Sequence, residues 1–512
     1  MRIHMTKFAR ILSASASLAI IAMSGQALAG KGDDTLNAAF EEEVATLDPY
    51  KEISRSGLIL GRMLFDNLLL KDQKSGEFLP ALAESYKVID GKTLEFVIRK
   101  GVKFHDGSEL SADDVVYTLN TVAAKEYNAR FQVAVNWIEV VEKTGPDTVR
   151  LRMKSVYPMA LEMLSGNLPI FSKRQLEAGG SAGISAKPIG TGPYRLVEMT
   201  AGRRYALERF DDYYAASPKG RPAIKRLVVR VLPEANVQYA ELLNGQLDWI
   251  WRLPPDAAKR LSGRPNITVK SWPIMRIGYI SMNPHFEGGK SPLADVRVRQ
   301  AINYAVDKQR IIKALVGGVS EPLYSACHPV QFGCSTDVTK YAFDPKKAKE
   351  LLTEAGYPNG FSLELVTAPS FPRAHIEAIA ANLSAVGIRT TINEQQPAPA
   401  RTTWMEGRAA AIVSAWGAYG VGDAALGTSP FFGGTGDDVV KDPKAIADLK
   451  IADSSADREE RKKHYAAAQR YIADQAYWLP LWTYSVNTAQ NSSLVLDVDP
   501  DEFVPFYRAS WK

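Results

Sequence analysis

Side chains able to do chemistry are spread along this chain without forming a known catalytic site. The sequence contains no H-E-x-x-H zinc motif and no glycine-rich dinucleotide fingerprint. The run Gly289-Lys290-Ser291 imitates the end of a phosphate-binding loop, but Pro284 occupies the position where that loop needs its first glycine. Acid–base catalysis would need two carboxylates facing each other across a cleft. We therefore expect no catalytic residues, and a secreted hydrolase is the remote alternative.

One pair of cysteines is the only candidate in the sequence for metal binding or redox chemistry. The six histidines stand far apart in the sequence, at positions His4, His105, His285, His328, His375 and His464. Cys327 and Cys334 are the only cysteines and lie in the loop-like run SACHPVQFGCSTD. A close, even pair in an exported protein indicates a disulfide; the alternative is a metal site that includes His328, although zinc normally takes four ligands. We predict a structural disulfide, no metal and no cofactor.

Aromatic residues in loop-like segments are the better candidates for contact with an organic ligand. They are Trp249, Trp251, Trp272, Trp404, Trp416 and Tyr419. Such side chains commonly line ligand clefts. The alternative is that they fill the hydrophobic core, and we expect this of more than half of these six residues. We retain Trp251, Trp404, Trp416 and Tyr419 as candidate ligand contacts.

The first 29 residues have the pattern of a secretory signal. Basic residues end at Arg10, an apolar stretch runs from Ile11 to Met23, and Ala27-Leu28-Ala29 precedes Gly30 in the A-x-A pattern of a cleavage site. A single membrane anchor is the alternative, but it needs about 20 apolar residues. We expect cleavage before Gly30 and a mature protein that is periplasmic and soluble.

The overall composition is that of a globular protein. Hydrophobic residues make up 46% and charged residues 23% of the 512-residue chain, and the formal net charge is +5. Three of those positive charges, on Arg2, Lys7 and Arg10, lie in the expected signal peptide. So small an excess does not favour nucleic acid as a partner.

Helix and strand patterns alternate along most of the chain, which predicts an α/β fold. Strand-like runs on both sides of Asp90-Gly91 predict a hairpin. Helices are expected after Ser111, over residues 296–316, after Asp344 as far as Gly356, and over 376–383 before the strand GIRTTI. The stretch from 179 to 193 contains GGSAG and GTGPY and is expected to be a loop-rich boundary.

Five blocks in order resemble one family. They are PALAESYKVIDGKTLEFVIRKGVKFHDGSELSADDVVYTLN (80–120), PIGTGPYRLVEM (188–199), SPLADVRVRQAINYAVDKQRII (291–312), FDPKKAKELLTEAGYPNGFSLEL (343–365) and YWLPLWTY (477–484). Together they are similar to the peptide/nickel-type extracellular solute-binding proteins, family 5. The resemblance covers essentially the whole chain after the signal segment.

This resemblance implies a periplasmic-binding-protein-like fold with two halves joined by a hinge and one extra inserted lobe. Lobe I would comprise residues 30–75, 190–273 and 485–512. Lobe II would be the insertion 76–189, and lobe III would be 274–484. The chain would cross between the halves near Trp272-Pro273 and again near Tyr484, and the halves would close on a ligand.

The resemblance also implies positions for ligand contacts. In peptide binders of the family, a tryptophan is followed three positions later by an aspartate that pairs with the peptide amino terminus. Here Trp416 takes the tryptophan position, Tyr419 stands three residues later, and the nearest acid is Asp423. Trp416 and Tyr419 would then wall the ligand while Asp423 binds an amine or hydroxyl; the alternative is that Asp423 caps a turn. Arg373 lies near where the family often places an arginine against a ligand carboxylate.

The function implied is that of the binding component of an ABC importer. It would capture a peptide or peptide-like small polar solute and deliver it to membrane permease subunits served by separate ATP-binding subunits. The alternatives within the same class are an oligosaccharide, an opine-like conjugate or a nickel complex. We expect a monomer that meets the membrane only through its permease.

Overall fold

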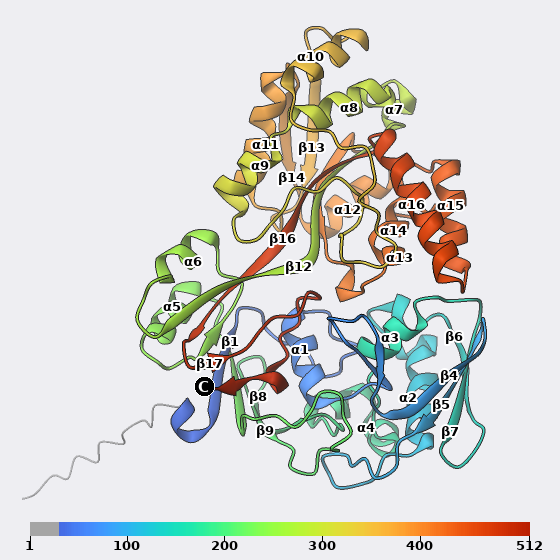
Figure 1. Ribbon diagram of the computed structural model, residues 1–512, viewed down its shortest axis with the longest axis vertical. Coiled ribbons are helices and arrows are strands. Elements are labelled where there is room, and N and C mark those ends of the chain that lie inside the picture. Colours follow the sequence, from blue (N-terminus) through green and yellow to red (C-terminus); the bar gives the residue numbers. More distant parts are fainter. Residues whose placement is uncertain (1–29) are drawn as a thin grey trace, which may run out of the picture.

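The computed structural model describes residues 30–512 and consists of two parts joined by two long strands (Figure 1). The lower part of Figure 1 contains β1–β11, α1–α6 and the C-terminal strands, and the upper part contains β13–β15 and α7–α16. The expected signal peptide, residues 1–29, lies outside the described residues.

A mixed ten-stranded sheet runs through both parts. Its strands occur in the order β14 (Arg389–Glu394), β13 (Ser362–Thr367), β15 (Ala411–Trp416), β12 (Ile267–Met282), β16 (Trp478–Asn491), β11 (Trp249–Ile250), β1 (Thr35–Phe40), β10 (Arg226–Val231), β9 (Arg204–Arg209) and β8 (Tyr194–Thr200). Strand β1 pairs in parallel with β10, and β13 pairs in parallel with β14. This alternation of helices with a partly parallel sheet is the predicted α/β class.

The long antiparallel pair β12 and β16 connects the two parts (Figure 1). Its register is interrupted between Pro273 and Ile277, where the ladder skips residues. The crossing points expected from the sequence, Trp272-Pro273 and Tyr484, lie inside these two strands. A second register shift follows between Gly278 and Tyr279. The lobe boundaries themselves remain a prediction.

The lower part carries a second sheet, which is antiparallel and has the order β4 (Ala83–Asp90), β5 (Thr93–Ile98), β7 (Thr148–Met153) and β6 (Ile138–Lys143). Alternate residues of β5, including Leu94 and Phe96, are buried in the core of this part. Helix α2 (Ala112–Ala123) packs over the same sheet, against β6 and β7. The other elements here are α1 (Arg55–Leu64), the pair β2 (Leu69–Lys71) and β3 (Phe78–Pro80), α3 (Ala160–Gly166), α4 (Lys173–Ala186), α5 (Ala235–Leu243), α6 (Pro255–Leu261), β17 (Leu494–Val495) and β18 (Ser510–Trp511).

Helices surround the upper end of the large sheet. They are α7 (Phe286–Gly289), α8 (Val296–Ala305), α9 (Lys308–Ile311), α10 (Pro345–Glu354), α11 (Arg373–Ala385), α12 (Pro397–Met405), α13 (Ala424–Gly427), α14 (Ser429–Phe432), α15 (Pro443–Ser454) and α16 (Arg458–Asp474). A core that includes Leu365, Ile376 and Leu479 fills the space between this sheet and its helices. Burying these side chains is the main favourable contribution to folding.

Most local predictions are confirmed. Strands β4 and β5 form the hairpin around Asp90-Gly91, and the Ser111 backbone and hydroxyl groups donate to the carboxylate of Asp114 at the start of α2. Asp344 caps α10, and Gly356 ends it with a φ of 90°, a conformation that favours glycine.

Two predictions differ from the structure. The helix expected over 296–316 breaks after Ala305, because Asp307 caps a new helix with a hydrogen bond from the backbone of Arg310. The stretch expected to be loop-rich is helical as far as Ala186, with a kink at Gly180. This glycine-rich segment has a poor intrinsic helix propensity. The tertiary packing of Leu176 and Ile184 keeps it helical.

The GTG sequence that follows α4 is needed for a close backbone approach. A Cβ atom on Gly190 would lie 1.9 Å from the carbonyl oxygen of Leu64, and one on Gly192 would lie 2.4 Å from the Leu64 carbonyl carbon. The Gly192 N–H also donates to that oxygen at 3.0 Å. These glycines therefore allow the segment after α4 to pack against the end of α1.

The predicted disulfide between Cys327 and Cys334 is present, with Cα atoms 5.7 Å apart. His328, the other ligand of the alternative metal site, is buried, and its Nδ1 lies 3.4 Å from the backbone nitrogen of Val330. Burial lowers the pKa of His328 to about 4. The disulfide closes a short loop in the upper part.

Candidate ligand-binding site

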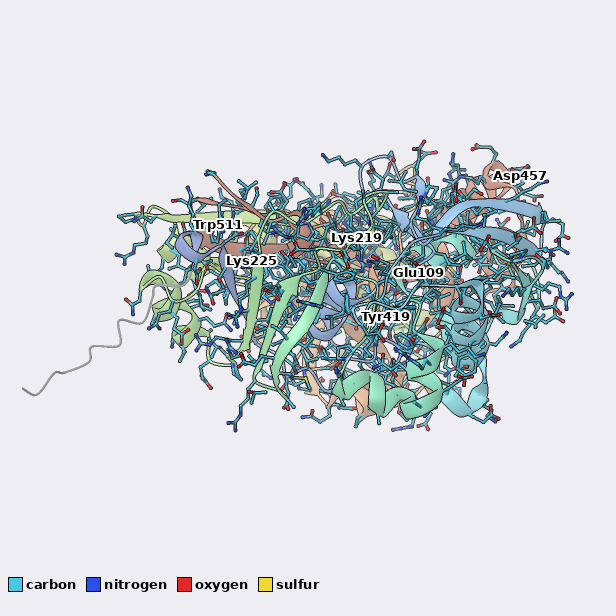
Figure 2. All side chains as sticks on the ribbon, turned by 90° about the horizontal axis from the view of Figure 1, so that it is seen from below. Glu109, Lys219, Lys225, Tyr419, Asp457 and Trp511 are labelled. Carbon is cyan, nitrogen blue, oxygen red and sulfur yellow. A yellow bond between two sulfur atoms is a disulfide. The ribbon has the colours of Figure 1, made fainter. Side chains whose placement is uncertain are left out.

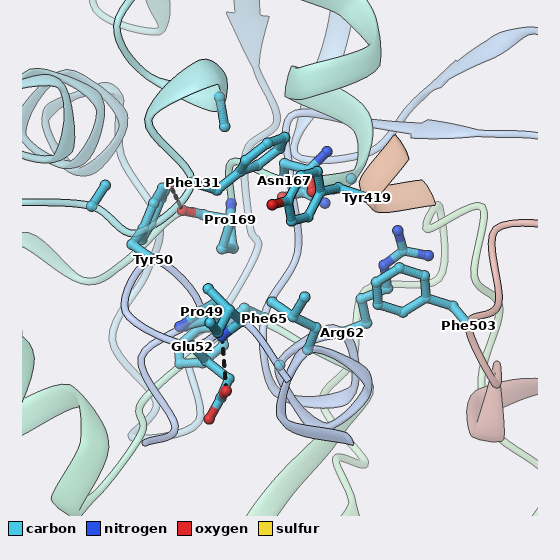
Figure 3. Close-up of a pocket in the computed structure, with 17 residues that line it drawn as sticks. Pro49, Tyr50, Glu52, Arg62, Phe65, Phe131, Asn167, Pro169, Tyr419 and Phe503 are labelled. Carbon is cyan, nitrogen blue, oxygen red and sulfur yellow. Dashed lines mark hydrogen bonds between the residues drawn. The ribbon is translucent and has the colours of Figure 1, made fainter. Parts of the chain in front are cut away.

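Two cavities lie side by side where the upper and lower parts meet. The first, which we call the aromatic cavity, has a volume of about 40 Å³ and is shown in Figure 3. The second, which we call the arginine cavity, has a volume of about 290 Å³. Ile53 and Tyr419 line both cavities. The two cavities therefore adjoin, and the arginine cavity contains most of the space in this form.

The aromatic cavity is built mainly from the lower part. Its walls come from residues 49–67, 129–134 and 166–169 together with Phe503, and Tyr419 is the contribution from the upper part. The rings of Tyr50, Phe65, Phe131 and Tyr419 surround the space (Figure 3). The Tyr50 hydroxyl donates to the carbonyl oxygen of Pro169 at 2.7 Å. A largely apolar wall with a few fixed polar groups is typical of a site for an organic solute.

Tyr419 is held in an unusual backbone conformation. Its φ is 51° and that of Ala418 is 44°, values that residues other than glycine seldom adopt. Its side chain is 43% exposed although it lies near the middle of the molecule in Figure 2. Strained backbone of this kind is concentrated at ligand clamps and active sites. The strain is consistent with a binding role for the loop that follows β15.

Glu42 is the acid in the lining of the arginine cavity, and the three arginines of that lining meet at a buried carboxylate behind it, that of Glu502. Glu502 Oε1 accepts hydrogen bonds from Arg252 Nη2 at 3.0 Å and Nε at 3.2 Å, and Oε2 accepts one from Arg276 Nη2 at 3.2 Å. Arg55 Nε lies 4.0 Å from the same Oε2. Burial alone would raise the pKa of Glu502, but the three arginines outweigh that effect and its pKa is lowered. Glu502 is therefore ionised.

Trp416 and Tyr419 come together at the arginine cavity, and both line it. Their rings meet edge to face with centroids 5.5 Å apart, and Trp416 makes the same kind of contact with Phe431 at 5.4 Å. The Trp416 indole N–H donates to the carbonyl oxygen of Leu426 at 2.6 Å, which fixes the ring. The pair thus forms a rigid aromatic wall of the cavity.

The structure contradicts the expectation that Asp423 offers a free carboxylate to a ligand. Asp423 is 3% exposed and lines neither cavity. Its Oδ1 accepts hydrogen bonds from the backbone of Ala425 at 3.0 Å and from Arg461 Nη2 at 2.8 Å. Because this carboxylate is buried and lies outside both cavities, a ligand in either cavity does not reach it in this form. The turn-capping alternative is the correct one.

Three other candidates lie away from both cavities. Trp251 is 4% exposed and packs in the core against Phe40, and Trp404 is 5% exposed in a cluster under α12 with its indole N–H bonded to the backbone of Asp437. Arg373 begins α11 on the surface, where it pairs with Glu377 at 2.9 Å. In this structure the two tryptophans fill core space and the arginine projects into solvent, so the structure does not bring them to the cavities.

The sequence reasoning missed most of the cavity residues. Arg55, Arg252, Arg276 and Phe131 come from four distant segments, and no spacing along the chain links them. Only Arg252 could have been found from the sequence, because it directly follows Trp251, which was a candidate ligand contact.

A literal match to the G-x-S-x-G pattern, GGSAG at 179–183, was also missed. In serine hydrolases this serine occupies a sharp turn between a strand and a helix. Here Ser181 lies inside α4, and its hydroxyl donates to Asp48 at 2.5 Å. Ser181 therefore does not lie in the strand-to-helix turn that the pattern requires. Its bond to Asp48 connects α4 to the N-terminal segment.

Residues 30–512 lack a metal-binding cluster and a membrane-spanning helix. They contain no cluster of three or more histidine, cysteine, aspartate or glutamate side chains placed to hold a metal. In the same range no helix combines the length and apolar character needed to cross a bilayer.

Two parts joined by paired strands, with cavities at the junction, define a binding protein of the cleft type. Residues 77–438 match the family model described as bacterial extracellular solute-binding proteins, family 5. The chain therefore belongs to this family, whose members are the solute-binding components of ABC importers.

Named relatives have comparable lengths. The chain is 29% identical over 472 residues to heme-binding protein A of Haemophilus influenzae, covering 85% of this chain and 84% of that protein. It is 34% identical to the dipeptide-binding protein of Escherichia coli over 62% of this chain and 63% of that protein. The structure of HbpA2 from Haemophilus parasuis superimposes with a TM-score of 0.82 and 26% identity, over 93% of this chain and 100% of that one. These relatives are binding proteins rather than enzymes.

Proposed function

We propose that this protein captures a peptide or peptide-like small polar solute between its two parts and delivers it to a membrane permease. The observation that carries the proposal is the pair of adjoining cavities that share Tyr419. Their combined lining of aromatic rings and a few charged groups suits a small peptide, which has an apolar body and polar ends. The resemblance to a dipeptide-binding protein supports the same class.

Delivery requires two conformations. In the form described here, Tyr419 of the upper part contacts Phe131 of the lower part, and a Cβ on Gly422 would lie 2.6 Å from Lys71 Nζ. Opening at the interrupted register of β12 and β16 would separate these contacts and admit the solute. The closed form is the one presented to the permease subunits, with ATP hydrolysis supplied by separate chains.

The working location is the periplasm, following removal of residues 1–29, and the protein acts as a monomer. The relationship to solute-binding proteins of importers supports this placement. The A-x-A pattern before Gly30 supports cleavage there. N-terminal sequencing of the exported protein should begin at Gly30, and a chain that retains Met1 would contradict the processing step.

The experiment that tests the function is identification of the solute carried by protein purified from the periplasm. Denaturation should release a peptide or peptide-like compound detectable by mass spectrometry, and refolded protein should bind it again in calorimetry. Release of a sugar, or failure of the refolded protein to bind any peptide, would contradict the proposal.

A further inference from the structure

The carboxylates of Asp33 and Asp248 converge on the backbone of Gly30, the first residue after the expected cleavage site. The Gly30 nitrogen donates a hydrogen bond to Asp33 Oδ1 at 3.1 Å. A Cβ atom on Gly30 would lie 3.4 Å from Asp248 Oδ1, so the second carboxylate lies next to the same residue. Two acidic side chains from distant parts of the sequence therefore meet at the start of the mature chain.

Asp248 is held in place where three strands meet. It directly precedes β11, and its Oδ2 accepts hydrogen bonds from the Asn37 backbone nitrogen at 2.9 Å and from Asn37 Nδ2 at 3.3 Å, in β1. Its backbone carbonyl accepts from the nitrogen of Asn491, at the end of β16, at 2.8 Å. The residue is almost fully buried. These bonds fix its carboxylate beside Gly30.

Neither carboxylate is balanced by a cationic side chain of residues 30–512. Within this range their hydrogen-bond partners are neutral amides, and no lysine or arginine lies within salt-bridge distance of Asp33 or Asp248. Lys31, the nearest cation in the sequence, donates instead to the backbone oxygen of Lys512. Burial raises the pKa of Asp248 to about 6, so it is ionised at neutral pH without a positive partner. A buried charge of this kind is costly unless it is paired.

Cleavage before Gly30 supplies a positive charge at this place. Hydrolysis adds water across the Ala29–Gly30 peptide bond, so Ala29 leaves with a carboxylate and Gly30 gains a primary amine. Such an α-amino group takes up a proton at neutral pH, because its ordinary pKa is about 7.7 to 8.0. A neutral amide with one N–H donor thus becomes an ammonium group with three.

We propose that Asp33 and Asp248 form a binding site for the N-terminal ammonium group of the mature chain itself. One N–H continues to donate to Asp33 Oδ1, and a second donates to Asp248 Oδ1. These charge-assisted bonds are stronger than the neutral bond of the precursor, and they fasten the start of β1 to the segment before β11. The inference rests on the proposed processing step and is independent of which solute the protein carries.

The pKa of the α-amino group distinguishes this ion pair from simple burial. Removing an amine from water disfavours its charged form and lowers its pKa, whereas a nearby carboxylate favours the charged form and raises it. An ammonium group held between two carboxylates should therefore lose its proton only at a pH well above the ordinary value. An N-terminus that extends freely into solvent should keep the ordinary value.

The test measures this pKa on mature protein purified from the periplasm, after mass spectrometry has established its first residue. The rate of α-amino acetylation by trace acetic anhydride is followed from about pH 6 to about pH 11, a range that brackets the ordinary pKa. Mass spectrometry of the N-terminal chymotryptic peptide gives the rate. The proteins compared are the wild type, Asp248→Asn, Asp33→Asn and, as a control, Asp337→Asn, whose exposed carboxylate pairs with Arg470 of α16. Circular dichroism checks that each variant is folded.

We expect an α-amino pKa of about 9 or higher in the wild-type and control proteins, roughly one pH unit or more above the ordinary value. Asp248→Asn should lower it by about one pH unit, and Asp33→Asn should lower it less, because water screens the more exposed Asp33. Asp33→Asn also keeps the comparison available if Asp248→Asn does not fold.

A wild-type pKa below about 9 would overturn the inference without reference to any variant, because the ordinary value is about 8. The same pKa in the wild type and in the folded variants would overturn it as well. A mature chain that begins at a residue other than Gly30 would overturn both the inference and the processing step. None of these results bears on solute capture, which the released solute tests separately.

Discussion

The ring of Tyr419 lies against the ring of Phe131 with centroids 4.4 Å apart, although the two residues belong to the upper and lower parts of the molecule. Tyr419 has a positive φ, and it lines both cavities at the junction. One side chain thus connects the two parts at the place where we propose that the ligand binds. Mutations around Tyr419 should distinguish residues that contact the ligand from residues that only stabilise the fold.

Trp416→Ala should weaken binding of the solute released from the purified protein by about 10- to 100-fold, in keeping with the loss of a buried aromatic contact. The reason is that the indole forms a rigid wall of the arginine cavity. Trp416→Phe, which keeps a ring, should retain most of the affinity. Calorimetry with the released solute measures both, and equal affinities of Trp416→Ala and wild type would show that the wall does not touch the ligand.

Asp423→Asn should destabilise the fold rather than change the ligand preference. The Asp423–Arg461 pair is 2.8 Å long, and both side chains are almost fully buried. Removing one partner of a buried pair leaves an uncompensated charge and costs about 3–5 kcal/mol. Urea unfolding measures the loss, and the double variant Asp423→Asn/Arg461→Met should recover part of it. Unchanged stability together with weakened binding would restore Asp423 to the site.

Replacing both Cys327 and Cys334 by serine should lower the free energy of unfolding by about 2–3 kcal/mol, because the short loop loses its cross-link in the unfolded state. Affinity for the solute should not change, since neither residue lines a cavity. Thiol titration of unfolded, non-reduced wild-type protein should find no free thiol. Two free thiols per chain would contradict the disulfide.

His105 should make the stability depend on acid pH. Its Nδ1 accepts from the Gly190 N–H at 3.2 Å and its Nε2 donates to the Gly192 carbonyl at 3.0 Å, an arrangement that needs the neutral ring. Burial lowers the pKa of His105 to about 4, against an unfolded value near 6.5. As the pH falls below 6.5 the unfolded chain takes up the proton first, so stability is lost between about pH 6.5 and pH 4.

The measurement for His105 is urea unfolding of the wild-type and His105→Asn proteins at pH 7.5 and 4.5. Between these two values, the wild type should lose about 2 kcal/mol more than the variant, because a pKa difference of one unit corresponds to about 1.4 kcal/mol. Other titrating groups are common to both proteins and cancel in the comparison. Parallel pH profiles would show that His105 does not carry this dependence.

Local chemistry made parts of the fold predictable from the sequence. The Asp90-Gly91 hairpin, the cap at Ser111 and the end of α10 at Gly356 depend on residues within a few positions of each other. The helix expected over 296–316 is too long because Asp307 caps a new helix within that range. The glycine-rich part of α4 is helical because tertiary packing outweighs its propensity.

The candidate site was predictable only where a family pattern marked it. Trp416 and Tyr419 carry that pattern and lie at the cavities, whereas Asp423, the nearest acid, was already paired with Arg461, a residue 38 positions away. Arg55, Arg276 and Glu502 meet only because β12, α1 and the C-terminal segment converge in three dimensions. Sequence spacing contains no information on such a convergence.

Hydrogen–deuterium exchange with and without the released solute tests most directly the claim that ligand binds between the two parts. Adding the solute to stripped protein should slow amide exchange in residues 49–67, 129–134 and 416–422 together, because these segments line the cavities and meet on closure. The disulfide loop at 327–334 should show no change. Protection confined to one part of the molecule, or unchanged exchange in all three segments, would contradict the account.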